Sequence, residues 1–175
     1  MTSYSVALHT LAGALSPWQS LFSNSKVVSG AVTFFHLAGL LFAGGFAVAS
    51  DRATFRALKG APNARTVLLT ELSDVHRPVL IGLGVLFASG MLLATADVET
   101  FGKSPVFLIK MTLVALLGLN GLVLQRTETA LRVRRNSLLE NVVDEPLWGR
   151  LRVTAMTSMG LWTAIVLAGT ILVSS

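Results

Sequence analysis

The sequence predicts an all-α integral membrane protein, a four-helix bundle preceded by an amphipathic helical segment. Three observations predict this fold class. The 175-residue chain is 53% hydrophobic and 13% charged, with a mean hydropathy of +0.68, which is too apolar for an ordinary soluble domain. It contains four apolar runs, each close to the ~20 residues that cross a bilayer. Its basic residues are concentrated in two of the connecting loops.

Residues 1–26 form the first predicted unit, an amphipathic segment on the outer membrane surface. Its apolar residues recur at spacings of three and four, the period of an amphipathic helix: Leu8, Leu11, Leu15 and Trp18. Ser16 and Pro17 predict a break, because serine is a good N-cap and proline suits the first helical position. The absence of Lys and Arg from residues 1–25 argues against a signal peptide. We expect two short helical pieces anchored by Trp18.

Residues 27–175 form the second predicted unit, the transmembrane bundle. Its four spans are residues 27–49, 78–96, 105–125 and 153–173. The helical period begins upstream of Pro78, so the second span should start in the loop before it and bend at that proline. Residues 97–104 form a short hairpin loop, which makes the second and third spans antiparallel neighbours. The third span should continue as a helix beyond the bilayer.

The distribution of basic residues predicts the orientation of the bundle. Of the 14 Lys and Arg residues, eleven lie between the first two spans or between the last two. Only Lys26 and Lys103 lie on the other side. By the positive-inside rule both basic loops are cytoplasmic and both termini are outside. Because these cations flank the spans, we expect lipid headgroups as their partners and no nucleic acid.

Small residues predict where the helices meet. Glycine recurs in every span and lets two backbones approach closely, which substitutes for the hydrophobic effect inside lipid. In the first span one helical face carries a run of mostly small residues: Thr33, His36, Gly39, Ala43 and Ala47. His36 should therefore face the interior of a tight bundle.

Three polar residues within the spans are the candidate site residues: His36, Lys110 and Asn120. Such groups are costly in lipid unless they are paired, neutral or hydrated. Helical rise places His36 about 13 Å and Lys110 about 7 Å below the outer edge, and Asn120 about 22 Å down. A flat ligand can lie between His36 and Lys110. Each also has a structural explanation, namely a cross-helix hydrogen bond for His36 and snorkelling to the headgroups for Lys110.

Several motifs in order resemble a broad bacterial group of four-span proteins. This group contains the copper-resistance-D-type membrane domain, the haem-dependent membrane protoporphyrinogen oxidase and uncharacterised families. The matching motifs are the Phe-His-Leu-Ala-Gly-Leu-Leu-Phe-Ala-Gly-Gly run of residues 35–45 with Asp51 and Arg52 after it, Arg77-Pro78, Ala88-Ser89-Gly90, and Phe107-Leu108-Ile109-Lys110 followed by Asn120. The segment Ser16-Pro17-Trp18 is similar to the uncharacterised members in particular.

The resemblance implies a b-type haem or another redox ligand near the outer half of the bundle. In the oxidase branch the matching histidine and lysine are associated with haem and activity, which points to His36 as the metal ligand and to Lys110. A histidine of the third helix in that branch is replaced here by Asn120, which we include as a cofactor-binding candidate. The group also implies a bacterial inner (cytoplasmic) membrane, with both termini periplasmic.

Three classes of function follow. The first is a haem-associated redox protein in which His36 is an axial ligand and Lys110 pairs with a propionate or substrate carboxylate. The second is a non-catalytic accessory subunit of a larger energy-transducing complex, bound to other membrane subunits or to copies of itself and needing no cofactor. The third is a transporter or metal-import domain. Hydrolase chemistry is disfavoured, because no acidic residue lies within any predicted span to orient His36 as a general base.

Overall fold

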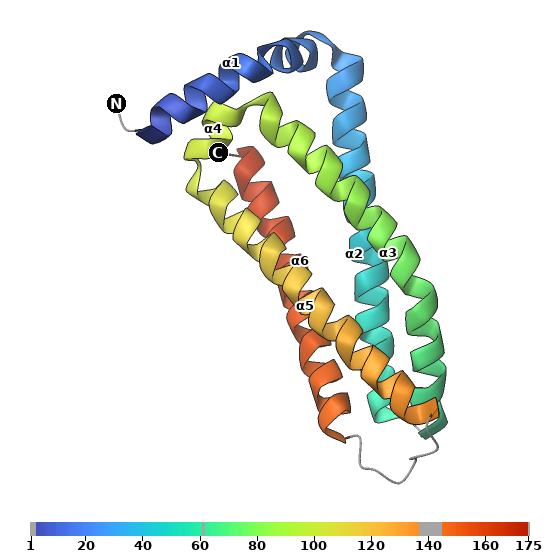
Figure 1. Cartoon of the computed structure of the whole chain (residues 1–175). Helices are drawn as coiled ribbons and strands as arrows, with labels where there is room; N and C mark the ends of the chain where they lie inside the picture. Colours follow the sequence, from blue (N-terminus) through green and yellow to red (C-terminus); the bar gives the residue numbers. More distant parts are fainter. Residues whose placement is uncertain (1–2, 61, 137–144, 175) are drawn as a thin grey trace.

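The computed structural model describes residues 3–60, 62–136 and 145–174, and the chain in these ranges is almost entirely helical. Its helices are α1 Ser3–Asn24, α2 Lys26–Lys59, α3 Pro62–Ala96, α4 Val98–Lys103, α5 Pro105–Asn136 and α6 Glu145–Ser174 (Figure 1). Four of them, α2, α3, α5 and α6, contain segments long and apolar enough to cross a membrane. The all-α class is therefore confirmed, and each predicted span corresponds to a helix able to cross a membrane, as expected of a multi-pass membrane protein.

Helices α2 and α3 form a tightly packed antiparallel hairpin. A Cβ atom at Gly39 would lie 2.9 Å from the backbone nitrogen of Leu86, and one at Gly82 would lie 3.0 Å from that of Ala43. Such distances leave no room for any side chain, so the two backbones meet directly. Gly39 and Ala43 are both buried, which confirms that the small-residue face of the first span lies against a neighbouring helix.

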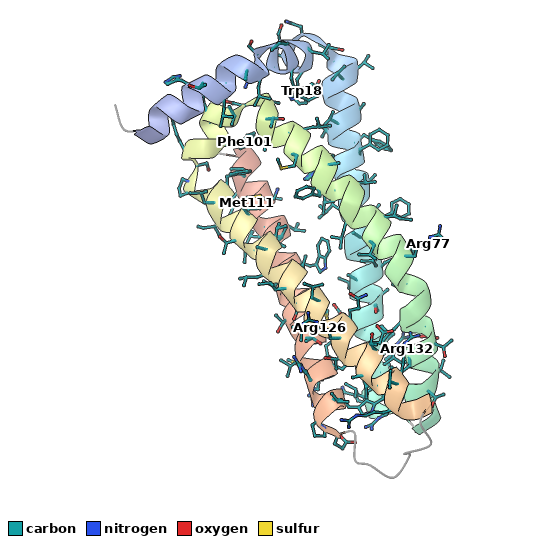
Figure 2. The ribbon with its side chains drawn as sticks, viewed as in Figure 1. Trp18, Arg77, Phe101, Met111, Arg126 and Arg132 are labelled. Atoms are coloured by element: carbon teal, nitrogen blue, oxygen red, sulfur yellow. The ribbon has the colours of Figure 1, made fainter. Side chains whose placement is uncertain are left out.

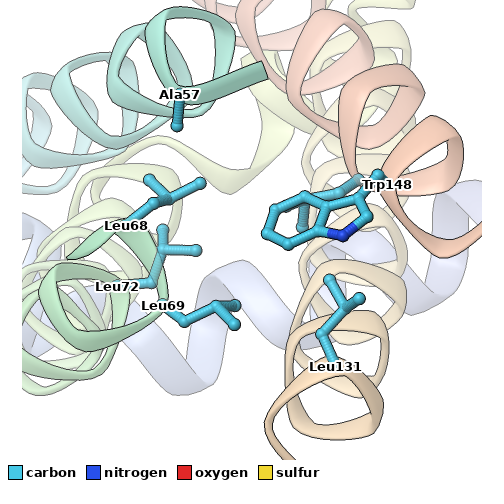
Figure 3. Close-up of a cluster of buried hydrophobic side chains, with 7 residues drawn as sticks. Ala57, Leu68, Leu69, Leu72, Leu131 and Trp148 are labelled. Carbon is cyan, nitrogen blue, oxygen red and sulfur yellow. The ribbon is translucent and has the colours of Figure 1, made fainter. Parts of the chain in front are cut away.

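Helices α5 and α6 form a second hairpin, which joins the first mainly through contacts between α6 and α2. All four long helices meet near the α2–α3 turn, in a buried apolar cluster (Figure 3). Its members are Ala57, Leu68, Leu69, Leu72, Leu131, Trp148 and Leu151. Toward the end that carries α1 the two hairpins diverge (Figure 1). We call the end of the bundle where the four long helices meet the closed end, and the opposite end, which carries α1, the α1 end.

Charged side chains reinforce the closed end. Arg132 pairs with Glu128 at 2.6 Å and also donates to the backbone carbonyl of Leu69, which ties α5 to α3. Arg65 pairs with Glu145 at 3.0 Å and stacks over the Trp148 ring at 5.1 Å from its centroid. By contrast, Arg77 projects away from the bundle (Figure 2). Some of the loop cations thus hold helices together, whereas Arg77 is exposed.

Helix α1 lies across the α1 end and differs from the prediction at Pro17. The expected break is wrong, since α1 is one continuous helix with Pro17 inside it. Proline removes one backbone hydrogen bond, but the next two residues bond to α3: Trp18 Nε1 donates to the Leu92 carbonyl at 3.2 Å, and Gln19 Nε2 to that of Thr95 at 3.3 Å. These bonds hold the second half of the helix in place.

The other predicted boundaries agree more closely. Helix α3 runs through Pro78, and α5 continues past its apolar segment to Asn136, as expected. The predicted hairpin loop contains a short helix, α4, because Asp97 caps it by accepting a hydrogen bond from the Thr100 backbone at 3.2 Å. A pair between His9 and Glu99, 2.9 Å apart, links α4 to α1.

The approach of α2 to α3 makes a testable prediction. Gly39→Ala should destabilise the hairpin by about 1–3 kcal/mol, because the added methyl group meets the Leu86 backbone, which cannot move aside as a side chain would. The matched control is Gly84→Ala in α3, where nothing lies within 4 Å of the new atom. Thermal unfolding in detergent should show a lower midpoint for the first variant and an equal or higher one for the second. Equal midpoints would contradict the proposed backbone contact.

Candidate functional site

His36 lies on the α2 face that packs against α3, and it is half-buried. Its Nδ1 atom is 3.2 Å from Oγ of Ser89. The edge of the ring rests on Gly90, where a Cβ atom would lie 3.2 Å from Cε1. The imidazole therefore points into the helix interface, as predicted, and fits there because residue 90 has no side chain.

The hydrogen bonds around Ser89 assign the tautomer of His36. Ser89 is buried, and its hydroxyl donates to the Val85 carbonyl at 2.6 Å. A hydroxyl has one proton, so toward His36 it can only accept, and the imidazole must donate from Nδ1. His36 is therefore assigned as the Nδ1–H form, and the lone pair is on Nε2.

Lys110 approaches the same place from α5. The side chain is half-buried, and its Nζ is 3.4 Å from the position of a Cβ atom at Gly169 in α6. Its charge is close enough to act on the His36 imidazole. Two of the predicted site residues therefore come together, and all four long helices contribute to the site. Because Gly90 and Gly169 have no side chains, His36 can pack against the first and Lys110 against the second.

Trp162 bounds the site on the side of the closed end. The indole is buried and lies against Gly44 of α2, with Cε3 3.4 Å from the position of a Cβ atom there. Gly44 is eight residues beyond His36, or about 12 Å along the helix. Along α6 the indole lies between Gly169, which is beside Lys110, and Thr154, which is beside Asn120.

Asn120 belongs to those other polar groups. It is ten residues beyond Lys110, about 15 Å further along α5. Its Nδ2 atom donates to the Thr154 carbonyl of α6 at 2.9 Å. The structure therefore does not bring Asn120 to His36 and Lys110, and its amide links α5 to α6.

Two buried carboxylates were missed by the sequence analysis. Asp51 and Glu128 are each only 3% exposed, although both lie just outside the predicted spans. Asp51 forms a hydrogen bond with Ser158 of α6. In the sequence it lies four residues after Ala47 and so continues the helical face that carries Gly39 and Ala43. Continuing that pattern past the predicted span end would have found it. It lies about 22 Å along α2 from His36, too far to act as a partner of the imidazole.

The arrangement of donors limits what the site can bind. Within the described ranges, no group of three or more His, Cys, Asp or Glu side chains is placed to hold a metal ion. A bare ion with several protein ligands is therefore not supported there. One oriented imidazole beside one ammonium group suits a ligand that brings most of its own metal ligands and carries negative charge.

The tautomer assignment can be tested directly. In ¹⁵N NMR spectra of histidine-labelled protein, His36 should give the pattern of an imidazole protonated at Nδ1 and unprotonated at Nε2. Ser89→Ala removes the acceptor, so the two neutral tautomers should become mixed. Thr95→Ala, which removes a hydroxyl elsewhere on α3, serves as the control and should leave the pattern unchanged. A wild-type signal showing Nε2–H would refute the assignment.

Comparison with known proteins gives no family assignment. No protein-family model matches the chain, and neither the curated proteins nor the solved structures contain a significant match. The similarity to the copper-resistance-D-type and protoporphyrinogen-oxidase group thus has no support beyond the motifs in the sequence, and it remains a prediction.

Proposed function

We propose that this protein is a small membrane redox protein that holds a b-type haem, with His36 as an axial ligand. The observation that carries the proposal is the orientation of the imidazole, whose Nδ1–H bonds to Ser89 while Nε2 keeps its lone pair. Metal-binding histidines are usually held in this way, by a hydrogen bond from the nitrogen that does not bind the metal. Haem, when bound, would supply one-electron chemistry.

Lys110 supports the same proposal through its charge. A half-buried ammonium group near the His36 imidazole is costly at membrane depth unless an anion accompanies it. A haem propionate is such an anion, and a charge-assisted hydrogen bond to it would satisfy Lys110. The lysine would then orient the macrocycle, while His36 binds the iron.

A second histidine ligand from α3 does not fit the geometry. His76 is thirteen residues from Ser89, about 20 Å along α3, so its backbone is far from the ring of His36. We therefore propose that His36 is the single histidine ligand.

The location of the site follows from the proposed orientation. With eleven of the 14 basic residues in the two loops of the closed end, the positive-inside rule makes that end cytoplasmic. We propose a bacterial inner membrane with both termini in the periplasm. His36 and Lys110 would then lie in the outer half, where a redox partner could be periplasmic or membrane-bound.

The other functions are less well supported by the site. A transporter needs a polar path through the membrane, whereas a buried apolar side chain, Trp162, lies at a level between His36 and Asn120. An accessory subunit of a larger complex needs no oriented imidazole. That alternative predicts a colourless protein that co-purifies in fixed stoichiometry with other subunits.

Absorption spectroscopy tests the role of His36. The detergent-purified protein should show a Soret band that shifts on reduction, and His36→Ala should abolish it without preventing insertion. The control is His9→Ala, which removes an exposed imidazole from α1 and should leave the spectrum unchanged. A colourless wild-type protein reconstituted with haem, or a His36→Ala spectrum identical to the wild type, would reject the proposal.

Haem titration tests the role of Lys110. Lys110→Met keeps the apolar length of the side chain but removes its charge, and it should weaken haem binding about tenfold or more. Lys103→Met removes an exposed charge from α4 and should have no effect. Unaltered affinity in Lys110→Met would mean that the lysine only reaches toward the headgroups.

A further inference from the structure

A groove lies on the outside of α2, just below its junction with α1, and is separate from the His36–Lys110 site. It has a volume of about 530 Å³. Phe22 of α1 bounds its upper part, while Gly30, Phe34 and Leu37 of α2 line it further down. Gly30 has nothing within 4 Å of the position of a Cβ atom, so the groove is open there. Its lower lining is strongly exposed, with Phe34 at 65% and Leu37 at 58%.

One end of the groove carries a positive charge. Lys26 lines it and is exposed as the first residue of α2. A cation is unfavourable at a helix N-terminus, where the helix dipole is positive. In the described part of the chain no carboxylate forms an ion pair with Lys26. An external anion would satisfy this charge.

The position of Lys26 relative to α1 indicates where that anion is. Helix α1 lies across the end of the bundle with Trp18 bonded to α3 (Figure 2), and tryptophan is enriched at the level of the lipid headgroups. Lys26 follows α1 directly and therefore lies at that level. From Lys26 to Leu37 the groove descends about 16 Å, close to the ~15 Å thickness of one hydrocarbon leaflet.

We propose that this groove binds one anionic phospholipid of the adjacent leaflet. The Lys26 ammonium pairs with the headgroup phosphate region, and an acyl chain lies over Gly30 between Phe34 and Leu37. Charge at the top and apolar surface along the depth of one leaflet match the two parts of such a lipid. The bound lipid would cover the outer face of α2 beside its junction with α1. The proposal does not depend on haem binding.

Native mass spectrometry of the full-length protein in detergent, with phosphatidylglycerol or phosphatidylcholine added, tests the proposal. Lys26→Gln should weaken binding of phosphatidylglycerol about fivefold, the factor corresponding to ~1 kcal/mol for one basic residue at an anionic surface, and leave phosphatidylcholine unchanged. Gly30→Leu fills the groove and should weaken binding of both lipids. Since nothing lies near Gly30, this variant should fold normally.

Two matched variants serve as controls. Lys103→Gln removes the same charge from α4, and Gly118→Leu adds the same side chain to an open position on α5. Neither should change lipid retention. The proposal is overturned if Lys103→Gln weakens binding as much as Lys26→Gln, because net charge alone would then explain the effect. It is also overturned if Gly118→Leu weakens binding as much as Gly30→Leu, because lipid contact anywhere on the helices would then explain it. It also fails if either groove variant binds lipid as the wild type does.

Discussion

The direct contact of the α2 and α3 backbones at Gly39 and Gly82 is the constraint on which the rest of the structure depends. Inside lipid, helices gain little from excluding water, so association requires close packing and cross-helix hydrogen bonds. Both occur on this interface: two glycines bring the backbones together, and one turn away Ser89 meets His36. The same approach that holds the hairpin together therefore also orients the imidazole. A wider separation would leave the ring without an acceptor.

The two ends of the bundle are held together by different contacts. At the closed end, an apolar cluster, the pair of buried Glu128 with partly exposed Arg132, and the Arg65–Trp148 contact bind the four helices together. At the α1 end, where the hairpins diverge, the helices are held by connections through α1 and α4. The two ends therefore differ in what holds them together: a buried cluster with ion pairs at the closed end, and helix contacts through α1 and α4 at the other.

The basic residues of this protein have more than one role. As a group they predict the orientation of the chain, yet Arg65 and Arg132 also form specific contacts between helices, and Arg77 projects away from the bundle. Lys110 and Lys26 differ from all of these: one is half-buried beside a histidine, and the other is exposed at the end of an apolar groove. The surroundings of each cation in the fold therefore distinguish it from the others.

The sequence by itself determined the all-α class, the four spans and the face on which His36 lies, because these depend on composition and on the 3.6-residue period. It also placed His36 and Lys110 at similar depths. Only the tertiary structure decided that Ser89 accepts from His36, that Asn120 bonds to α6 instead of joining the site, and that Asp51 is buried. These outcomes depend on which helices are neighbours and how far they rotate, which no single helical period specifies. The continuity of α1 through Pro17 has the same origin, since bonds to α3 outweigh a local preference for a break.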